Sequence, residues 1–279
     1  MNRDPWKRNM TSESSWPWPC PACASGRLYL EKSSLVLRET SESREYRRSR
    51  DEGDHEPDAF TQRFCCLLVC SQAHCKEPVV VCGTTVEEEE MDGEGGTEWK
   101  TYLHPVYFNP PLRMISIPAG CPASVRNQLE KAFALYWCDP LSCSNRIRNS
   151  VELLLTHLGV PRFRTDAHKQ KRRRRWLHER IELFRSRSRQ GRELATLMFA
   201  VKVIGNEGSH PGALTREDLL DAFELLEHVL SILFAPPEQN RLTAIAKAIH
   251  RSNKPRSHKG RRVVRRNVGP AFTPTHPAQ

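Results

Sequence analysis

The chain has 279 residues, of which 38% are hydrophobic and 27% are charged, so it is long and apolar enough to bury a core. Its formal net charge of +10 favours polyanionic partners such as nucleic acid. The sequence has no stretch near the roughly 18 apolar residues of a membrane helix, and its start lacks the apolar region of a secretory signal. We therefore expect a cytoplasmic protein without membrane contact.

The first hundred residues are expected to form a β module behind a flexible arm. The arm, residues 1–19, is polar and rich in Trp and Pro, and its tryptophans are expected to pack around the arm or the module. The module covers residues 20–100 and contains β-like runs at 27–30, 35–37 and 77–81. Charged residues dominate 38–58, predicted to be an extended loop or a disordered insertion, and 87–98, predicted to be an acidic linker.

The second half has the periodicity of helices. Residues 101–123 contain five prolines, which favours an extended connector. From Ser124, interpreted as an N-cap, apolar residues recur at helical spacing, and residues 124–235 are predicted to form an antiparallel bundle of five helices. Residues 236–279 are predicted to be a basic, disordered tail, with room for a short sixth helix over 242–249.

Three boundaries within the bundle have recognisable signals. Gly159 is expected to end the second helix, and Gly205 with Asn206 to end the fourth in left-handed conformations. Thr215 and Asp218 have the spacing of a capping box at the start of the fifth helix. The predicted fold class is therefore α+β, with a small zinc-ribbon-like β module followed by an antiparallel α-helical bundle.

Ten cysteines in a cytoplasmic chain indicate metal binding before disulfides. A Cys-x2-Cys knuckle and a second, looser Cys-x4-Cys pair can together supply the four thiolates of a closed, structural zinc site: Cys20, Cys23, Cys70 and Cys75. Such a site leaves no coordination position open for catalysis. Other ligand choices remain open, since Cys65, Cys66, His74 and Cys82 are close in sequence. The simpler alternative is buried, unpaired cysteines, which we favour for Cys65 and Cys66.

A run of basic residues, with no acidic residue among them, precedes the third helix of the predicted bundle. It suits a sequence-independent contact with the phosphate backbone of RNA or DNA, and the alternative is a solvated helix face. The candidate nucleic-acid-binding residues are Lys169, Lys171, Arg172, Arg173, Arg174 and Arg175.

The segment from Lys202 through Gly205-Asn206 to His210 resembles the signature of domain-of-unknown-function family 4145. Members of this family typically show a Lys or Arg, then Gly-Asn, then His. The helix with Arg148 and Glu152 resembles the family's helix with an Arg and a Glu, and Cys20-Pro-Ala-Cys23 resembles the start of a zinc ribbon that also occurs ahead of this domain. The likeness covers roughly residues 105–234 well, and 20–82 more loosely.

This family is similar in turn to the HEPN helical bundles, many of which are dimeric RNases in toxin and anti-phage systems. The resemblance implies a catalytic set of His210 as general acid or base, Asn206, and Lys202 as a cation for the scissile phosphate. Gly205 stands where those enzymes have an arginine, which weighs against catalysis. A capping and packing role for this segment is the favoured interpretation.

Three functions follow from these patterns. The first is a non-catalytic module that binds nucleic acid or protein, accessory to bacterial restriction or anti-phage defence and with a defence-system subunit as partner. The second is a metal-independent HEPN-type RNase. The third is a dimerising structural scaffold, present as a homodimer. Salt separates the first from the third, because backbone binding weakens steeply with ionic strength whereas apolar dimerisation does not.

Overall fold

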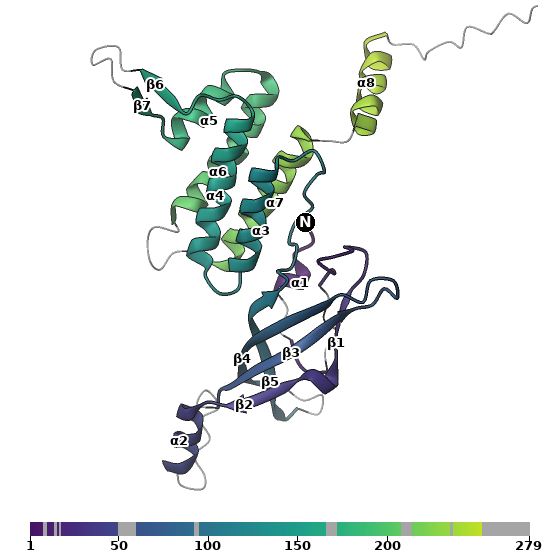
Figure 1. The fold of residues 1–279 in the computed structure, drawn as a ribbon, viewed down its shortest axis with the longest axis vertical. Coiled ribbons are helices and arrows are strands. Elements are labelled where there is room, and N and C mark those ends of the chain that lie inside the picture. The colour runs from purple at the N-terminus through teal and green to yellow at the C-terminus, as the bar shows by residue number, and fades with distance from the viewer. Residues whose placement is uncertain are drawn as a thin grey trace, which may run out of the picture. The chain divides into compact units, whose positions relative to one another are not determined.

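The computed structural model describes residues 1–7, 10–13, 16, 18–49, 60–91, 95–165, 172–207, 214–234 and 237–252. The chain divides into two units, residues 1–235 and 236–279. The first unit combines an antiparallel, curled sheet with a set of helices (Figure 1), which confirms the predicted α+β class. The second unit contains helix α8 (Pro237–Ser252), longer than the short helix predicted over 242–249. The tail predicted to be disordered lies, from residue 253, outside the described residues.

The main sheet is built around one central strand, β3. Its five strands are β1 (Leu28–Leu30), β2 (Val36–Glu39), β3 (Gln62–Cys70), β4 (Pro78–Met91) and β5 (Thr97–Asn109). The short strands β1 and β2 share one edge of β3, separated by the 3₁₀ turn η1 (Lys32–Ser34), and β4 occupies the other edge. Along β3, burial alternates with period two, so its even-numbered residues face the core and its odd-numbered residues face outward.

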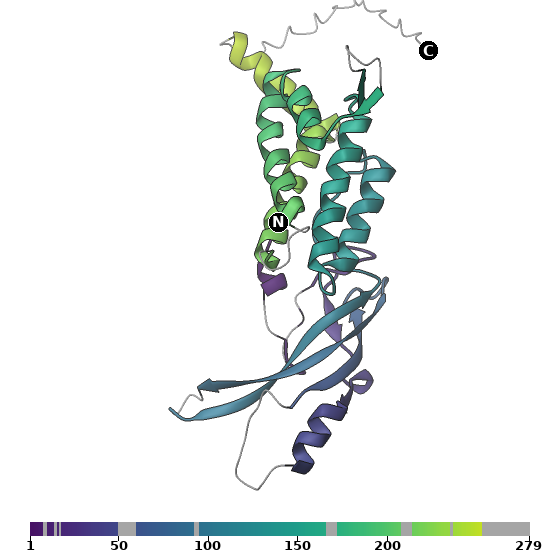
Figure 2. The same cartoon turned by 90° about the vertical axis from the view of Figure 1, so that its left-hand side faces the viewer.

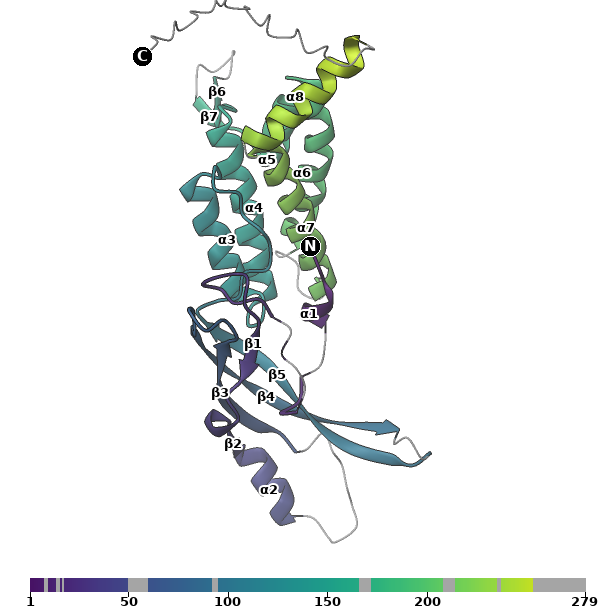
Figure 3. The same ribbon diagram turned by 90° about the vertical axis from the view of Figure 1, so that its right-hand side faces the viewer.

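The acidic segment 87–98, predicted to be a linker, instead contains the paired ends of two long strands in its described residues 87–91 and 97–98. Strands β4 and β5 remain paired from Val80–Asn109 to Met91–Thr97, well beyond the end of β3 (Figure 3). Lys100 on β5 stabilises this acidic end of the two strands, because its ammonium group lies 2.7 Å from the Glu90 carboxylate and 2.8 Å from the Glu98 carboxylate. The prediction failed because cross-strand charge pairing offsets the repulsion that makes an isolated acidic run unstructured.

The insertion 38–58 also contains more structure than expected. Its first residues complete β2, and helix α2 (Ser41–Ser49) follows directly. The hydroxyl of Ser43 accepts a hydrogen bond from the Thr61 amide (2.8 Å) and donates one to the Thr61 carbonyl (2.9 Å), which fastens α2 to the start of β3. Residues 50–59 lie outside the described part of the chain.

The segment predicted to be a flexible arm is largely buried where the structure describes it. Trp18 is fully buried, and its ring packs edge-on against Trp16, Phe108 and Trp137 at 5.0–5.6 Å between centroids. The Trp18 indole N–H donates to the Pro5 carbonyl at 2.7 Å. Large aromatic surfaces contribute strongly to stability when they are buried, so the Trp18 ring anchors the described part of this segment to the fold.

Polar contacts add to this packing. Helix α1 (Asp4–Lys7) lies in a segment that pairs with the acidic face of α7 (Arg216–Leu233). Arg3 lies 2.7 Å from Asp221, and Lys7 lies 2.8 Å from Glu217. Met10 forms an isolated bridge with Leu103 of β5. The described residues among 1–19 therefore belong to the folded unit, and for them the prediction of an arm is wrong.

Besides α7, the helices of the first unit after β5 are α3 (Ala123–Leu135), α4 (Pro140–His157), α5 (Leu177–Arg185) and α6 (Arg189–Glu207). They pack on one another, with α4 lying against α3, α6 and α7, and the longer helices have near-parallel axes (Figure 2). A small hairpin of β6 (Phe163–Thr165) and β7 (Arg172–Arg174), which sequence patterns did not indicate, connects α4 to α5. None of the described helices has both the length and the apolar character that crossing a membrane requires.

Two of the predicted boundaries are confirmed. Gly159 has φ of +70° directly after the last residues of α4, and Thr215 and Asp218 form a capping box at the start of α7. Ser124 is not an N-cap, because α3 begins at Ala123 behind Pro122 without a side-chain cap.

The prediction for Gly205 is also wrong, because α6 continues through it to Glu207. A Cβ at Gly205 would lie 2.6 Å from the Cβ of Arg148 on α4. The missing side chain therefore allows α4 and α6 to approach closely and does not serve a left-handed cap.

Candidate metal centre and basic surface

Two loops of similar construction bring four cysteines together in the β module. In the first, Ala24 follows Cys23 in the left-handed region at φ 57°, and the Gly26 amide donates to Cys23 Sγ at 3.3 Å. The Cys20 amide closes this loop by donating to the Gly26 carbonyl at 2.9 Å. The backbone thus turns sharply around the two sulfur atoms.

The second loop connects β3 to β4 and repeats these features. Lys76 follows Cys75 with φ of 49°, and the Gln72 amide donates to Cys70 Sγ at 3.4 Å. The Cys70 amide closes the loop on the Glu77 carbonyl at 3.0 Å. Within the described residues, Ala24 and Lys76 are the two non-glycine positions with positive φ, and each directly follows the second cysteine of its pair. Such strained positions gather at ligand-binding sites.

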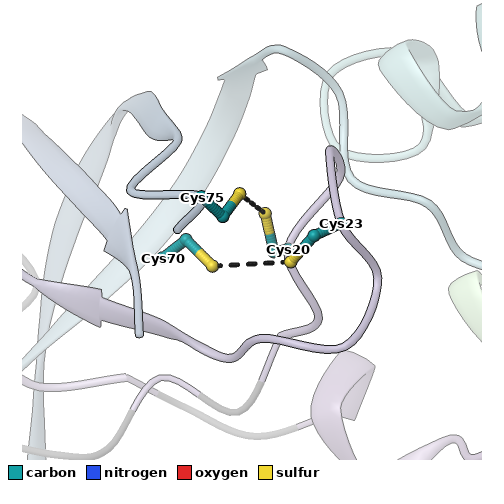
Figure 4. Close-up of side chains that lie close together, drawn as sticks. All are labelled: Cys20, Cys23, Cys70 and Cys75. Carbon is teal, nitrogen blue, oxygen red and sulfur yellow. Dashed lines mark hydrogen bonds between the residues drawn. The ribbon is translucent and has the colours of Figure 1, made fainter. Parts of the chain in front are cut away.

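The four sulfur atoms form one cluster (Figure 4). All lie within 4.8 Å of one another, with 3.7 Å between Cys20 and Cys75 and 3.6 Å between Cys23 and Cys70. Tetrahedral zinc with Zn–S bonds of about 2.3 Å places its sulfur ligands about 3.8 Å apart. The cluster could therefore hold a metal ion and is compatible with zinc in the arrangement predicted for Cys20, Cys23, Cys70 and Cys75.

The protonation of these thiols also favours a cation. A hydrogen bond with the Ser25 side chain lowers the pKa of Cys23 to about 6, whereas burial raises the pKa of Cys70 to about 12. Four neighbouring thiols cannot all ionise without a positive charge among them. A bound divalent cation supplies that charge and favours the thiolate form of every ligand.

The alternative ligands lie elsewhere. Cys65 and Cys82 are on the outward face of the sheet, opposite to the face on which Cys70 is buried, and His74 is exposed. Cys66 is buried as expected for a core residue, but Cys65 is exposed, so its assignment to the core is wrong. The strand alternation of two residues explains the difference between these adjacent cysteines.

A second candidate site lies in the helical half of the chain. A pocket of about 240 Å³ opens between α4 and α5, and its charged lining comprises four arginines and one glutamate: Arg146, Arg162, Arg174, Arg180 and Glu152. The Glu152 carboxylate forms ion pairs with Arg174 at 2.8 Å and with Arg148 at 3.5 Å. The positive charge of the pocket therefore exceeds its negative charge.

Arg180 has a structural role in this pocket. It is almost completely buried, and its guanidinium donates to the carbonyls of Glu152 (2.9 Å) and Val160 (3.2 Å) and to the Thr156 hydroxyl (2.9 Å). Burial lowers the pKa of Arg180, but an arginine remains charged at neutral pH. The group places a fixed cation at the C-terminal end of α4, where the helix dipole stabilises it.

One residue of the basic run predicted to bind nucleic acid, Arg174, lines this pocket. Arg172, Arg173 and Arg174 make up β7 and are exposed, and Arg175 follows them half-buried. Arg172 lies over the ring of Phe163 on β6, 4.0 Å from its centroid. Lys169 and Lys171 lie outside the described residues. Arg174 belongs both to the hairpin and to the pocket, so the two form one basic surface.

The catalytic set implied by the family resemblance is only partly described. Lys202 is half-buried and Asn206 is exposed, one turn apart on α6. His210 lies outside the described residues. Close to this pair, the Arg148 side chain of α4 lies against Gly205.

The sequence alone did not predict that Arg146, Arg162 and Arg180 line one pocket. A signal existed on α4, where Arg146, Asn149 and Thr156 recur at helical spacing and form a polar stripe beside the apolar one. The contribution of α5 could not be read from that stripe, because it depends on how the helices pack.

Residues 130–252 match the family model described as Domain of unknown function (DUF4145), which confirms a domain of the family that the sequence resembles. Residues 8–108 match a second model, described as Domain of unknown function (DUF8608), which spans the N-terminal segment, all four clustered cysteines and nearly the whole sheet. No curated protein and no solved structure matches this chain.

Proposed function

We propose that this chain is a non-catalytic nucleic-acid-binding module whose DUF4145 domain contacts a phosphate backbone. The observation that carries the proposal is the continuity of the basic surface, in which Arg174 joins the exposed arginines of β7 to the pocket between α4 and α5. Guanidinium groups bind phosphate oxygens in a bidentate manner, so this surface suits a sugar–phosphate backbone without selecting a base sequence.

The metal centre has a structural role in this proposal. Four thiolates complete the coordination of zinc and leave no position for water or substrate, so the ion holds the two loops together and performs no chemistry. Metal analysis is expected to find one zinc per chain. Cys23→Ser should lose this zinc, whereas Cys138→Ser, which removes an exposed cysteine outside the cluster, should retain it.

Binding and cleavage are tested together with labelled single-stranded RNA and DNA in buffer without chelator, from about 50 to 200 mM salt. The proposal expects binding that weakens steeply over this range without cleavage of the RNA. Absence of binding at low salt would refute it and leave the dimerising scaffold as the better account. In that case the oligomeric state, measured by light scattering, should be a salt-insensitive homodimer.

A second candidate is a metal-independent RNase in a HEPN-like bundle. The observation in its favour is the contact of Gly205 with Arg148, which could supply the guanidinium that the Gly205 position lacks. In this case Arg148 and Lys202 hold the scissile phosphate and His210 transfers the proton. RNA cleavage that disappears in His210→Ala would establish this function, and cleavage that survives the substitution would exclude it.

The biological setting follows from family resemblance alone. An accessory role in bacterial restriction or anti-phage defence, with a defence-system subunit as partner, rests on that association and not on the geometry of the site. Co-purification of the full chain from its native host, compared with a variant in which Arg146 and Arg162 are both Gln, separates partners held through nucleic acid from partners held by protein contacts.

A further inference from the structure

Cys65 and Cys82 face each other on the outward side of the sheet and take no part in the metal centre. They are direct partners in the register of β3 and β4, and their sulfur atoms lie 2.8 Å apart. Both cysteines are free thiols in the structure, Cys65 exposed and Cys82 half-buried. Two thiols in contact at an accessible position require a chemical explanation, because neither fills the core.

The backbone at this position suits a covalent link. The Cys70 amide bonds to the Glu77 carbonyl, which makes Cys70–Glu77 a hydrogen-bonded pair of the antiparallel ladder. Hydrogen-bonded and non-hydrogen-bonded pairs alternate along an antiparallel ladder. Because Cys65 lies five residues before Cys70 in the same register, Cys65–Cys82 is a non-hydrogen-bonded pair. In such pairs the Cα atoms are about 4.5 Å apart, which is within the range of about 4.4–6.8 Å that a disulfide spans.

We propose that Cys65 and Cys82 are a redox-modification site, at which a low-molecular-weight disulfide oxidises them to a reversible cross-strand disulfide. The Cys65 thiolate attacks the small disulfide, forms a mixed disulfide and releases one thiol. The Cys82 sulfur then attacks Cys65 Sγ, releases the second thiol and closes the intramolecular bond. The protein loses two electrons and two protons, and the small disulfide gains them as two thiols.

The surroundings explain the order of attack and the selectivity. Cys65 is the more exposed sulfur, whereas burial raises the pKa of Cys82 to about 11, so Cys82 enters the reaction as the resolving thiol. Cys66 points to the opposite, buried face, and burial raises its pKa to about 12. The flanking partners, Val36 on β2 and Tyr107 on β5, leave the pair open to solvent.

The disulfide would also close the loop that carries two of the four cysteines of the metal centre. The chain between Cys65 and Cys82 contains the β3–β4 loop with Cys70 and Cys75, so the bond would close this loop independently of the metal. Closing a loop of this length restricts the unfolded chain, and the oxidised protein is expected to melt several degrees higher.

The test uses the full, zinc-loaded chain equilibrated in oxidised and reduced glutathione at several ratios, followed by alkylation and peptide mass mapping. We expect a Cys65–Cys82 cross-linked peptide that dithiothreitol removes, and no such peptide in Cys65→Ser or Cys82→Ser. The control variant Cys138→Ser should form the link as the wild type does, because Cys138 is exposed and lies on neither β3 nor β4.

Two outcomes would overturn the proposal. One is stable glutathionylation of Cys65 without closure to Cys82. The other is a cross-link through Cys66 or a metal-cluster cysteine in place of the proposed pair. Zinc content and far-UV circular dichroism of each variant are measured alongside, so that loss of the fold is not mistaken for loss of the reaction.

Discussion

Gly26 is the position at which one added methyl group should disturb the metal centre most. A Cβ there would lie 2.3 Å from Cys70 Sγ, 3.0 Å from Gln72 Cγ and 3.4 Å from Cys23 Sγ. Ordinary contacts between such atoms need about 3.5–4.0 Å, so Gly26→Ala must displace the Cys70 sulfur by about 1 Å or more. Metal sites tolerate deviations of only about 0.2 Å in their bond lengths.

The expected magnitude follows from the cost of such overpacking, about 1–3 kcal/mol. Because about 1.4 kcal/mol corresponds to a factor of ten, zinc affinity in Gly26→Ala should fall by about 5- to 150-fold. The assay is a competition titration against a chromophoric zinc chelator, with circular dichroism to verify that the sheet and helices remain folded.

Ala24→Gly is the matched control in the same loop. Ala24 has φ of 57°, which glycine adopts without strain, so this variant should bind zinc at least as tightly as the wild type. Equal zinc affinity in Gly26→Ala and wild type would refute the reasoning, since the methyl group would then have been accommodated without moving a ligand.

Three further predictions concern stability. Trp18→Ala should destabilise the chain by about 3–5 kcal/mol in urea denaturation, because the fully buried Trp18 ring is lost, and a change below about 1 kcal/mol would contradict its burial. Gly205→Ala should cost up to about 2 kcal/mol in the same assay, because overpacking against Arg148, about 1–3 kcal/mol, exceeds the gain in helix propensity of about 1 kcal/mol. Stabilisation would place Gly205 on an open helix face. Hydrogen bonds from Thr215 lower the pKa of Asp218 below its ordinary value of 3.8. The ionised Asp218 carboxylate therefore stabilises the folded state above pH 3.8, and this stabilisation is lost as pH falls through the folded pKa. Asp218→Asn should therefore be less stable than wild type at about pH 7, and the difference should shrink as pH falls below 3.8. A pH-independent difference would show that the carboxylate charge has no role.

The metal centre could be predicted from the sequence because its chemistry depends on residue type and local spacing. Cys20 and Cys23 have the spacing of a knuckle, and Cys70 and Cys75 form a second, looser pair, although 46 residues separate Cys23 from Cys70. What sequence could not provide was the face of the strand on which each cysteine lies. That requires the register of β3, which places Cys70 inward and Cys65 outward.

The failed predictions share a physical cause, because each depended on partners distant in sequence. The segment with Trp18 looked like an arm until Phe108 and Trp137 provided its packing surface. Gly205 has the local character of a helix terminator, but its neighbour Arg148 lies on another helix. Local propensity is a weak guide wherever tertiary contacts compete with it.

The capping signals at Gly159 and Thr215 were predicted correctly for the converse reason. A left-handed glycine after a helix and a capping box before one are completed within a few residues. Their energetics therefore depend little on the rest of the fold, and a single sequence is sufficient to find them.

The central claim is that the arginines of the α4–α5 pocket contact a phosphate backbone. The most direct measurement is the salt dependence of the dissociation constant for labelled single-stranded RNA, compared between wild type and a variant with Arg146→Gln and Arg162→Gln. Each lost phosphate contact should reduce the slope of log affinity against log salt by about 0.7, so the variant should bind more weakly with a slope lower by about 1.4. The control Arg38→Gln, on β2, should keep the wild-type slope. An unchanged slope in the double variant would contradict the claim, because the pocket would then contribute no phosphate contact.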